Sequence, residues 1–321
     1  MAFEDDLGID ASQAGAESYA VSATGLVSRT FNLWFRKLGQ YIIIVGLAGA
    51  AFALISFFIL IIFFSSIGTI ATNPISYIFS NLLLPPFPET TLIATSLGFA
   101  IVAFIVNAII TGAATKFALD DYGGEKSAEI GSSFSYALGK TGNIIIVQII
   151  QTILVTGATA PGLALALRAL AGIDITDPLN PIIAPGTMEL MMTALVLTLV
   201  GLIFALYFSI RFAPVFAIVV DSNLSAIDSL KKSWDITGGN MMHVFGGMFL
   251  VGLIVAILGA MVSTLLFFST YSSVITAVIT ALLFSALNLI FSVVLYRDLF
   301  ARRGESSLDS LMVGRDTGWE Q

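Results

Sequence analysis

His243 is the side chain with the widest chemical range in this sequence, because an imidazole can serve as general base, general acid or metal ligand. It is the single histidine of the 321 residues, and the chain contains no cysteine. No acid lies nearer to it along the chain than Asp235. A catalytic or metal-binding role would therefore need partners from other helices. The pattern favours an interfacial histidine that faces a neighbouring helix or lipid headgroups.

Three acids surround a pair of glycines in the first half of the chain. Asp120, Asp121 and Glu125 flank Gly123 and Gly124. Carboxylates beside a glycine turn can bind cations, but this spacing does not match the EF-hand pattern. We expect an exposed turn here. With no catalytic or metal-binding set of residues, the sequence predicts a protein that is not an enzyme and that holds no metal and no cofactor.

The stretch SLKKSWDITGGN, from Ser229 to Asn240, is polar between two long apolar runs and is a candidate loop for catalysis or ligand binding. Its local pattern favours a helix instead. Ser225 and Asp228 form an S-x-x-D capping box, which predicts a helix that begins directly after Ser225. Gly239 or the glycine before it is expected to take a positive φ at the far end of the helix, and Asn240 leads into the next apolar run.

The faces of this helix predict where it lies. Trp234 shares one face with Ile227 and Leu230, whereas Lys231 and Lys232 lie on other faces, each four residues from an acid. Such a helix is expected to lie flat at a membrane surface. Trp234 would then sit in the aromatic belt, with the lysines toward the headgroups.

Composition identifies the class of protein that positions these residues. Hydrophobic residues make up 57% of the chain and charged residues 11%, compared with about 45–50% and about 25% in soluble domains. The net charge of −7 argues against nucleic acid as a partner, because phosphate binding needs clustered cations. Membrane lipids are the expected surroundings.

Six apolar stretches are long enough for membrane helices, which need about 20 residues each. Strands of a barrel would show a short alternating pattern, which these runs lack. The sequence therefore predicts an all-α, polytopic membrane protein. The six stretches are Tyr41–Ile70, Leu92–Phe117, Ile144–Leu167, Met191–Val220, Met242–Phe268 and Val274–Tyr296.

The cations predict the orientation, because Lys and Arg near helix ends are retained on the cytoplasmic side. All of the 14 Lys and Arg residues except Arg168 fall on one side of the six stretches. We therefore expect a plasma-membrane protein with both termini in the cytoplasm. The acidic residues 1–19 are expected to be disordered, and 304–321 to form a cytoplasmic tail. The expected outward segments are 71–91, 168–190 and 269–273.

Internal similarity divides the membrane domain, residues 20–303, into three parallel repeats of about 20–120, 121–221 and 222–303. Each unit is expected to consist of a cytoplasmic-side amphipathic helix followed by a transmembrane hairpin. Trp34 of the first unit aligns with Trp234 of the third. The three amphipathic segments are Ala20–Tyr41, Ser127–Ile144 and Ser225–Met241.

The arrangement of Ala226, Ser233-Trp234 and Gly239-Asn240 after an apolar helix that ends in Arg211 resembles a known membrane domain. That domain is fused to some glycerophosphodiester phosphodiesterases, and related six-helix prokaryotic membrane proteins share the pattern. In the fused enzymes a separate soluble barrel carries out catalysis. The resemblance therefore implies a membrane module and transfers no catalytic residue.

Arg211 is a cation inside the fourth apolar stretch, at a depth that costs several kcal/mol unless the charge is accommodated. Pro214 is expected to end or kink the helix, so that residues 212–220 lie along the membrane interface. Arg211 would then extend to the interface. The alternative is an ion pair with Asp221, Asp228 or Asp235.

Polar residues within the apolar stretches define a candidate path through the membrane. Such residues usually join helices by hydrogen bonds, and no acidic relay accompanies them. Two functions remain: a non-catalytic membrane module that organises lipid or partner proteins, including a second copy of the chain, or a transporter or channel for a small solute or lipid. The candidate path comprises Asn107, Thr111, Gln148, Gln151, Thr152, Thr156 and Asn288.

Overall fold

The computed structural model of the chain describes residues 19–66, 89–123, 128–170, 173–174, 182–265 and 272–303. The predicted terminal tails, 1–19 and 304–321, lie outside these residues except for Tyr19. Most of the predicted outward segments 71–91 and 269–273 also lies outside them.

Helices form almost all of the described chain, and two short strands pair antiparallel, with Ile173 opposite Ile183. The strands are β1 (Ile173–Asp174) and β2 (Ile182–Ile183). The helices are α1 (Ala23–Arg36), α2 (Leu38–Tyr41), the π-helical turn η2 (Ile42–Gly46), α3 (Leu47–Ser66), α5 (Glu89–Gly123), α6 (Ile130–Leu170), α7 (Thr187–Arg211), α8 (Val215–Asp221), α9 (Ala226–Gly238), α10 (Met241–Leu265), α11 (Ser272–Phe284) and α12 (Leu287–Arg302).

Six helical segments of the described chain are long and apolar enough to cross a membrane. Each overlaps one of the six predicted stretches. The predicted helical fold, with six helices long and apolar enough to cross a membrane, is therefore confirmed. The segments are Leu38–Phe57, Leu97–Gly123, Ile130–Leu170, Thr187–Asp221, Met241–Leu265 and Val274–Arg302.

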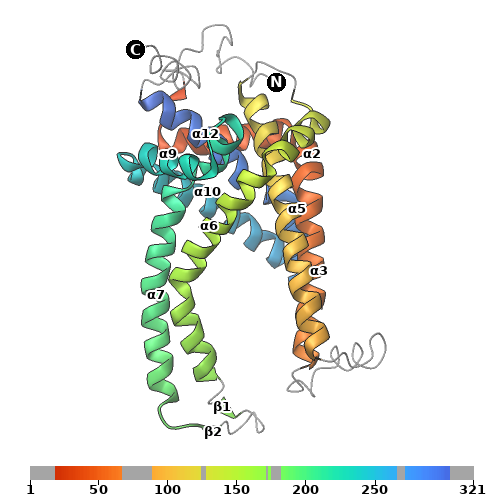
Figure 1. The fold of residues 1–321 in the computed structure, drawn as a ribbon, viewed down its shortest axis with the longest axis vertical. Helices are drawn as coiled ribbons and strands as arrows, with labels where there is room; N and C mark the ends of the chain where they lie inside the picture. Colours follow the sequence, from red (N-terminus) through yellow and green to blue (C-terminus); the bar gives the residue numbers. More distant parts are fainter. Residues whose placement is uncertain are drawn as a thin grey trace, which may run out of the picture.

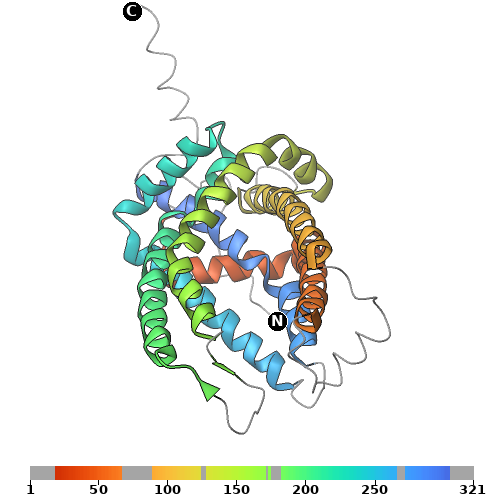
Figure 2. The ribbon, with the colours of Figure 1, turned by 60° about the horizontal axis from the view of Figure 1, so that its bottom comes forward.

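The long helices form two pairs. α6 and α7 run antiparallel and are joined through β1 and β2, while α3 and α5 form the second pair (Figure 1). α10 and α11 lie between the two pairs (Figure 2). Glycine lets α6 and α7 approach closely, since a Cβ built on Gly162 would lie 2.5 Å from the Thr198 nitrogen. A Cβ on Gly201 would lie 2.3 Å from the Ala158 oxygen, as is common where membrane helices cross at small residues.

The buried core lies at the end of the molecule that carries α9 and α12, the top of Figure 1. Leu26 of α1, Val215 of α8 and Leu295 of α12 are all fully buried there. Toward the other end, α7 exposes large apolar side chains such as Met192 and Ile203. Apolar helix surface of this kind is stable in lipid, where the helix satisfies its own backbone. One end of the molecule is therefore packed like the core of a soluble protein. Toward the other end, the helices expose apolar side chains on their outer surface.

The second predicted amphipathic segment, Ser127–Ile144, is not a separate helix. From Ile130 onward it belongs to α6, which continues without interruption to Leu170. Ala137 and Ile144 both pack against Gly112 of α5, where an added Cβ would lie 3.0 Å and 2.7 Å from their side chains. This close packing holds the segment helical up to the transmembrane part. The first and third segments do form the separate helices α1 and α9.

The fourth predicted stretch breaks near Pro214, as expected: α7 ends at Arg211 and α8 begins at Val215. The surroundings of the following residues differ from those of a helix at a membrane surface, however. Val215, Val219 and their neighbours in α8 are buried in protein. α8 packs against α5, α6, α9 and α12, so these helices take the place of lipid around it.

Candidate functional site

A partly open cavity of about 490 Å³ lies beside the end of α7. Its volume is in the range of small-molecule sites, about 300–1,000 Å³. Residues from α6, α7, α8, α10, α12 and the turn between α7 and α8 form its walls. They are Gln151, Thr152, Val155, Thr156, Phe208, Ser209, Phe212, Ala213, Phe216, Met248, Val251, Asn288, Leu289, Phe291 and Ser292.

The cavity gathers part of the predicted polar path. Gln151, Thr152 and Thr156 of α6 lie in its wall together with Asn288 of α12. None of the residues that form the wall is charged. The cavity therefore combines aromatic and aliphatic surface with a few uncharged hydrogen-bonding groups, as is typical of sites for mainly apolar ligands.

The break between α7 and α8 exposes backbone carbonyls, and side chains satisfy them. Gln151 Nε2 donates to the Phe212 oxygen at 3.4 Å, and the Ser292 hydroxyl donates to the Ala213 oxygen at 2.8 Å. The Ser233 hydroxyl of α9 donates to the Arg211 oxygen at 2.8 Å. Unwound helices in transporters can bind cations through such carbonyls. Here the three oxygens are engaged within the protein.

Three residues of the predicted path lie outside the cavity wall. Gln148 is buried on α6, and its Oε1 has no hydrogen-bond partner among the described residues. Thr111 is buried on α5, whereas Asn107, one turn earlier, is exposed. The predicted path is therefore divided: four of its residues lie in the cavity wall, whereas Gln148 of α6 and two residues of α5 lie outside it.

Arg211 is held by aromatic rings and a carbonyl. Its Nη1 donates to the Trp234 oxygen at 3.1 Å, and its Nε donates to the Tyr207 hydroxyl at 3.3 Å. The guanidinium carbon lies 4.7 Å from the Trp234 ring centroid and 5.4 Å from that of Tyr207. Cation–π contacts of this kind contribute about 0.5–2 kcal/mol. They offset part of the cost of a charge at this depth and direct it away from the cavity.

α9 begins as the sequence predicts. The Asp228 N–H donates to the Ser225 hydroxyl oxygen at 3.2 Å, and this hydroxyl donates to the Asp228 carboxylate at 2.7 Å. The predicted positive φ at its C-terminal end is wrong, because Gly239 has φ −86°. Among the described glycines, Gly186 before α7 has a positive φ, of 81°. α10 starts one residue after Asn240, whose carbonyl accepts the Val244 N–H at 3.0 Å.

The charged side chains of α9 are largely exposed, and two of them contact α12 or the residue after it. Lys231 Nζ lies 3.7 Å from the Asp228 carboxylate, and Lys232 Nζ lies 5.2 Å from the ring centroid of Phe300 in α12. Asp235 pairs with Arg303, just after α12. The hydrogen bond from Arg303 lowers the pKa of the Asp235 carboxyl, and the positive charge of Lys232 contributes.

The two aligned tryptophans occupy different surroundings. Trp34 is buried, and its Nε1 donates to the Leu283 oxygen at 3.0 Å near the end of α11. Trp234 is 38% exposed, and its ring centroid lies 5.7 Å from that of Phe212. Trp34 and Trp234 align in sequence but differ in their surroundings, because α11 covers Trp34 and leaves it buried.

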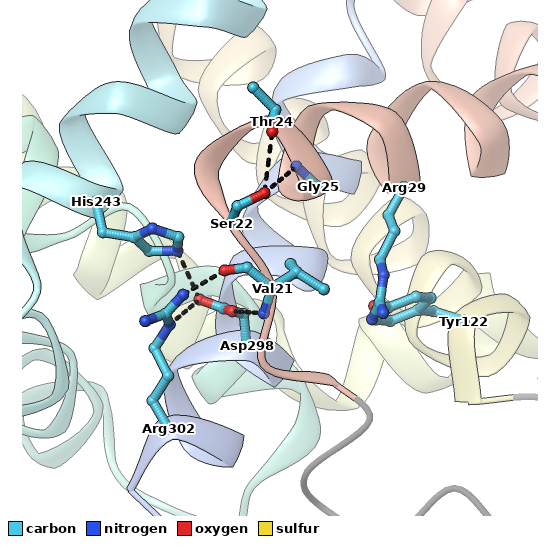
Figure 3. A network of polar contacts seen from close by, with 9 residues as sticks. All are labelled: Val21, Ser22, Thr24, Gly25, Arg29, Tyr122, His243, Asp298 and Arg302. Atoms are coloured by element: carbon cyan, nitrogen blue, oxygen red, sulfur yellow. Dashed lines mark hydrogen bonds and ion pairs between the residues drawn. The ribbon is translucent and has the colours of Figure 1, made fainter.

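The sequence did not indicate the partner of His243. Its Nε2 lies 2.9 Å from Asp298 Oδ2 of α12, a carboxylate that is 1% exposed (Figure 3). Arg302 Nε donates to the same oxygen at 3.0 Å, and the Val21 N–H donates to Oδ1 at 2.7 Å. Arg302 also donates to the Val21 oxygen. Asp298 thus joins α10, α12 and the segment before α1. In the sequence, Asp298 is a lone acid near the end of an apolar helix and lies four residues before Arg302. This is the signal that could have indicated a buried charged network here.

The acids near the end of α5 do not form an exposed turn, because α5 continues to Gly123. The side chain of Asp121 is buried and lies 2.8 Å from Arg36 and 3.0 Å from Lys37. Asp120 pairs with Lys116 at 2.6 Å. Glu125 lies outside the described residues. Asp121 therefore connects the end of α1 to the end of α5, whereas the Asp120 pair lies within α5.

The described residues contain no group of three or more His, Cys, Asp and Glu side chains that could hold a metal ion. Comparison with protein-family models, curated proteins and solved structures found no match to the chain. The function therefore has to be inferred from the geometry of the cavity and its surroundings.

Proposed function

We propose that this protein is a non-catalytic integral membrane module that binds lipid in the cavity beside α7 and α8 and thereby organises lipid or partner membrane proteins. The cavity carries the proposal. It is formed by residues of helices with membrane-spanning composition, and its wall is mainly apolar with a few uncharged polar groups. A lipid is the molecule of matching chemistry that surrounds such helices at the highest concentration.

The proposed orientation places both termini in the cytoplasm of a cell, in its plasma membrane. The arrangement of the cations supports it. α9, α12 and the start of α6 lie at one end of the molecule (Figure 1), while Arg168 stands in the last turn of α6, at the other end. Grouping of cations at one membrane face is typical of the cytoplasmic side.

The proposed division into three repeats is supported by a contact that recurs three times. Each time, a polar or charged side chain of an amphipathic segment binds a residue at or just after the end of the transmembrane hairpin that follows it, at the boundary of the proposed unit. These contacts are Arg36 with Asp121, Lys140 Nζ with the Ser222 oxygen at 2.7 Å, and Asp235 with Arg303.

Contacts between the proposed units follow a second regular pattern. Tyr136 of the second unit lies under Lys116 of the first, with Nζ 5.1 Å from the ring centroid. Trp234 of the third unit contacts Arg211 of the second. Trp34 of the first unit donates its hydrogen bond to the third unit. An aromatic residue of each unit therefore packs on the unit before it, and the first packs on the last. The proposed similarity to the phosphodiesterase-associated membrane domain adds no catalytic role to this arrangement.

Lipid retention tests the proposed function. In Val155→Trp an indole would fill part of the cavity, whereas in Ile153→Trp it would face outward from the same helix, because Ile153 is 63% exposed and is not in the cavity wall. Both variants are purified with native lipids and analysed by native mass spectrometry. We expect Val155→Trp to lose a tightly retained lipid that the wild type and Ile153→Trp keep. Equal retention by all three proteins would contradict the proposal.

A transporter or channel for a small solute is the second candidate, and the shared cavity position of Gln151, Thr152 and Asn288 favours it. The satisfied carbonyls between α7 and α8 and the separate positions of Gln148 and Asn107 weigh against a continuous path. Solute flux into liposomes that Gln151→Leu abolishes and Asn107→Leu leaves intact would favour transport over the lipid-binding module.

A further inference from the structure

We infer that the cavity selects a neutral lipid whose polar end carries hydroxyl and ester or ether oxygens, and that Gln151 and Asn288 bind this end. The inference rests on the proposed lipid-binding function and names the class of ligand. Diacylglycerol is the simplest representative of this chemistry.

The first argument is charge. No lysine, arginine or histidine belongs to the cavity wall. Arg211, directly before the wall residue Phe212, directs its guanidinium to the Trp234 oxygen and the Tyr207 hydroxyl. Arg297 lies 3.7 Å from the Asp221 carboxylate. A phosphate in the cavity would therefore lose water without gaining a counter-ion, which is strongly unfavourable.

The second argument is hydrogen bonding. A primary amide offers two N–H donors and one carbonyl acceptor. Gln151 uses one donor, in a long bond of 3.4 Å to the Phe212 oxygen, and Asn288 is exposed at the cavity wall. Two amides in the wall of one cavity can donate to ester oxygens and accept from a hydroxyl. Ser209 and Ser292 already donate their hydroxyl protons to backbone oxygens, which leaves them as acceptors.

The third argument is the apolar part of the wall. Val155, Met248 and Leu289 surround the remaining space together with the rings of Phe208, Phe212 and Phe216. These side chains suit an acyl chain. A charged phospholipid that placed its acyl chain here, with its headgroup outside, would leave the two amides without a polar partner. Loss of the amides would then have no effect on binding.

Trp234 makes the test measurable, because its ring centroid lies 5.7 Å from that of Phe212 and 6.5 Å from that of Phe208, two residues of the cavity wall. Bromine atoms on a bound acyl chain would quench its fluorescence. The full-length protein is reconstituted in phosphatidylcholine bilayers. It is then titrated with dioleoylglycerol or dioleoyl phosphatidate, whose identical chains are brominated. The Trp234→Phe variant identifies the part of the signal that comes from Trp234.

We expect saturable quenching by the diacylglycerol at a concentration at least about tenfold lower than by the phosphatidate. Gln151→Leu combined with Asn288→Leu should weaken diacylglycerol binding by roughly three- to thirtyfold, as expected for two hydrogen bonds within a membrane. Asn107→Leu is the matched control, since Asn107 lies outside the cavity wall. The comparison of the two lipids uses the wild-type protein and does not depend on how a variant folds.

The outcomes separate the two proposals. Phosphatidate binding that equals diacylglycerol binding and disappears in Val155→Phe, which fills part of the cavity without adding a tryptophan, would overturn the neutral-lipid inference and leave lipid binding intact. Diacylglycerol binding unchanged by loss of both amides would overturn the assigned role of Gln151 and Asn288. Quenching by both lipids that is unaffected by Val155→Phe would overturn the lipid-binding function itself.

Discussion

Replacement of Asp298 by asparagine tests the buried network that joins the two ends of the described chain. The carboxylate is 1% exposed and accepts hydrogen bonds from Val21, Arg302 and, through Nε2, His243. In Asp298→Asn one oxygen would become an NH₂ group that faces N–H donors. The negative charge beside Arg302 would also be lost.

The expected cost follows from these contacts. Removing one member of a buried charged pair typically costs about 3–5 kcal/mol, and each hydrogen bond to a charged group contributes about 1.5–3 kcal/mol. The Arg302 side chain is 30% exposed, so water can stabilise its charge again after the substitution. We therefore expect Asp298→Asn to lower the free energy of unfolding by about 3 kcal/mol, the lower end of the range.

The free energy of unfolding can be measured in bicelles by reversible denaturation. Asp228→Asn is the matched control, because Asp228 is 56% exposed in its pair with Lys231 and exposed pairs contribute at most about 1 kcal/mol. A double-mutant cycle with Arg302→Gln should show a coupling energy of about 1 kcal/mol or more. If Asp298→Asn cost no more than Asp228→Asn, the network would not contribute to stability and the reasoning would be refuted.

Three further predictions concern packing, pH and orientation. Gly162→Val should separate α6 from α7 and lower the unfolding free energy by about 1–3 kcal/mol, whereas Gly157→Val, with no neighbour within 4 Å of its added Cβ, should cost less than 1 kcal/mol by the same denaturation. Because its arginine partner lowers the pKa of Asp235, this carboxyl stabilises the fold above its unfolded pKa of about 3.9 and ceases to do so as the pH falls through the lower folded pKa. Asp235→Asn should therefore cost under about 1 kcal/mol at pH 7, and the difference from wild type should diminish as the pH falls through the folded pKa of this carboxyl. Lys231→Cys should react with a membrane-impermeant thiol reagent only after cells are opened, and Met188→Cys should react in intact cells.

Each of these predictions has a contradicting result. Equal losses for the two glycine variants would show that α6 and α7 do not depend on their close crossing. A difference between wild type and Asp235→Asn that grew as the pH fell would reverse the sign of the linkage. Labelling of Lys231→Cys from outside intact cells would refute the proposed orientation. Since the chain has no cysteine, the single-cysteine variants need no other change.

The sequence predicted features that depend on neighbouring residues along the chain. Apolar runs of sufficient length correspond to six helical spans, Pro214 marks the break after α7, and Ser225 caps α9. Each follows from local chemistry: the cost of exposing apolar side chains, the missing N–H of proline, or a hydroxyl beside free backbone donors. Part of the cavity wall could also be predicted from the sequence, because Gln151, Thr152 and Asn288 are polar residues within apolar runs.

The features that depend on distant residues could not be predicted. Trp34 appears interfacial from its own helix, but Leu283 of α11 accepts its N–H. Residues 212–220 appear suited to a membrane surface, but four helices cover α8. His243 appears isolated because Asp298 follows it by 55 positions. In each case the local sequence is compatible with a position in contact with lipid and with a position buried in protein. Which of the two the residues occupy depends on tertiary packing.

The hydrogen bond between Val21 and Asp298 spans 277 positions, which has a consequence for biosynthesis. Membrane helices insert as they are synthesised and then associate, and α12 is the last helix of the described chain to leave the ribosome. α1 therefore waits, without its Asp298 partner, until all six spans have been made. A ribosome stalled before α12 would hold an inserted but unclosed protein, with the apolar face of α1 open to the membrane surface and to quality-control proteases.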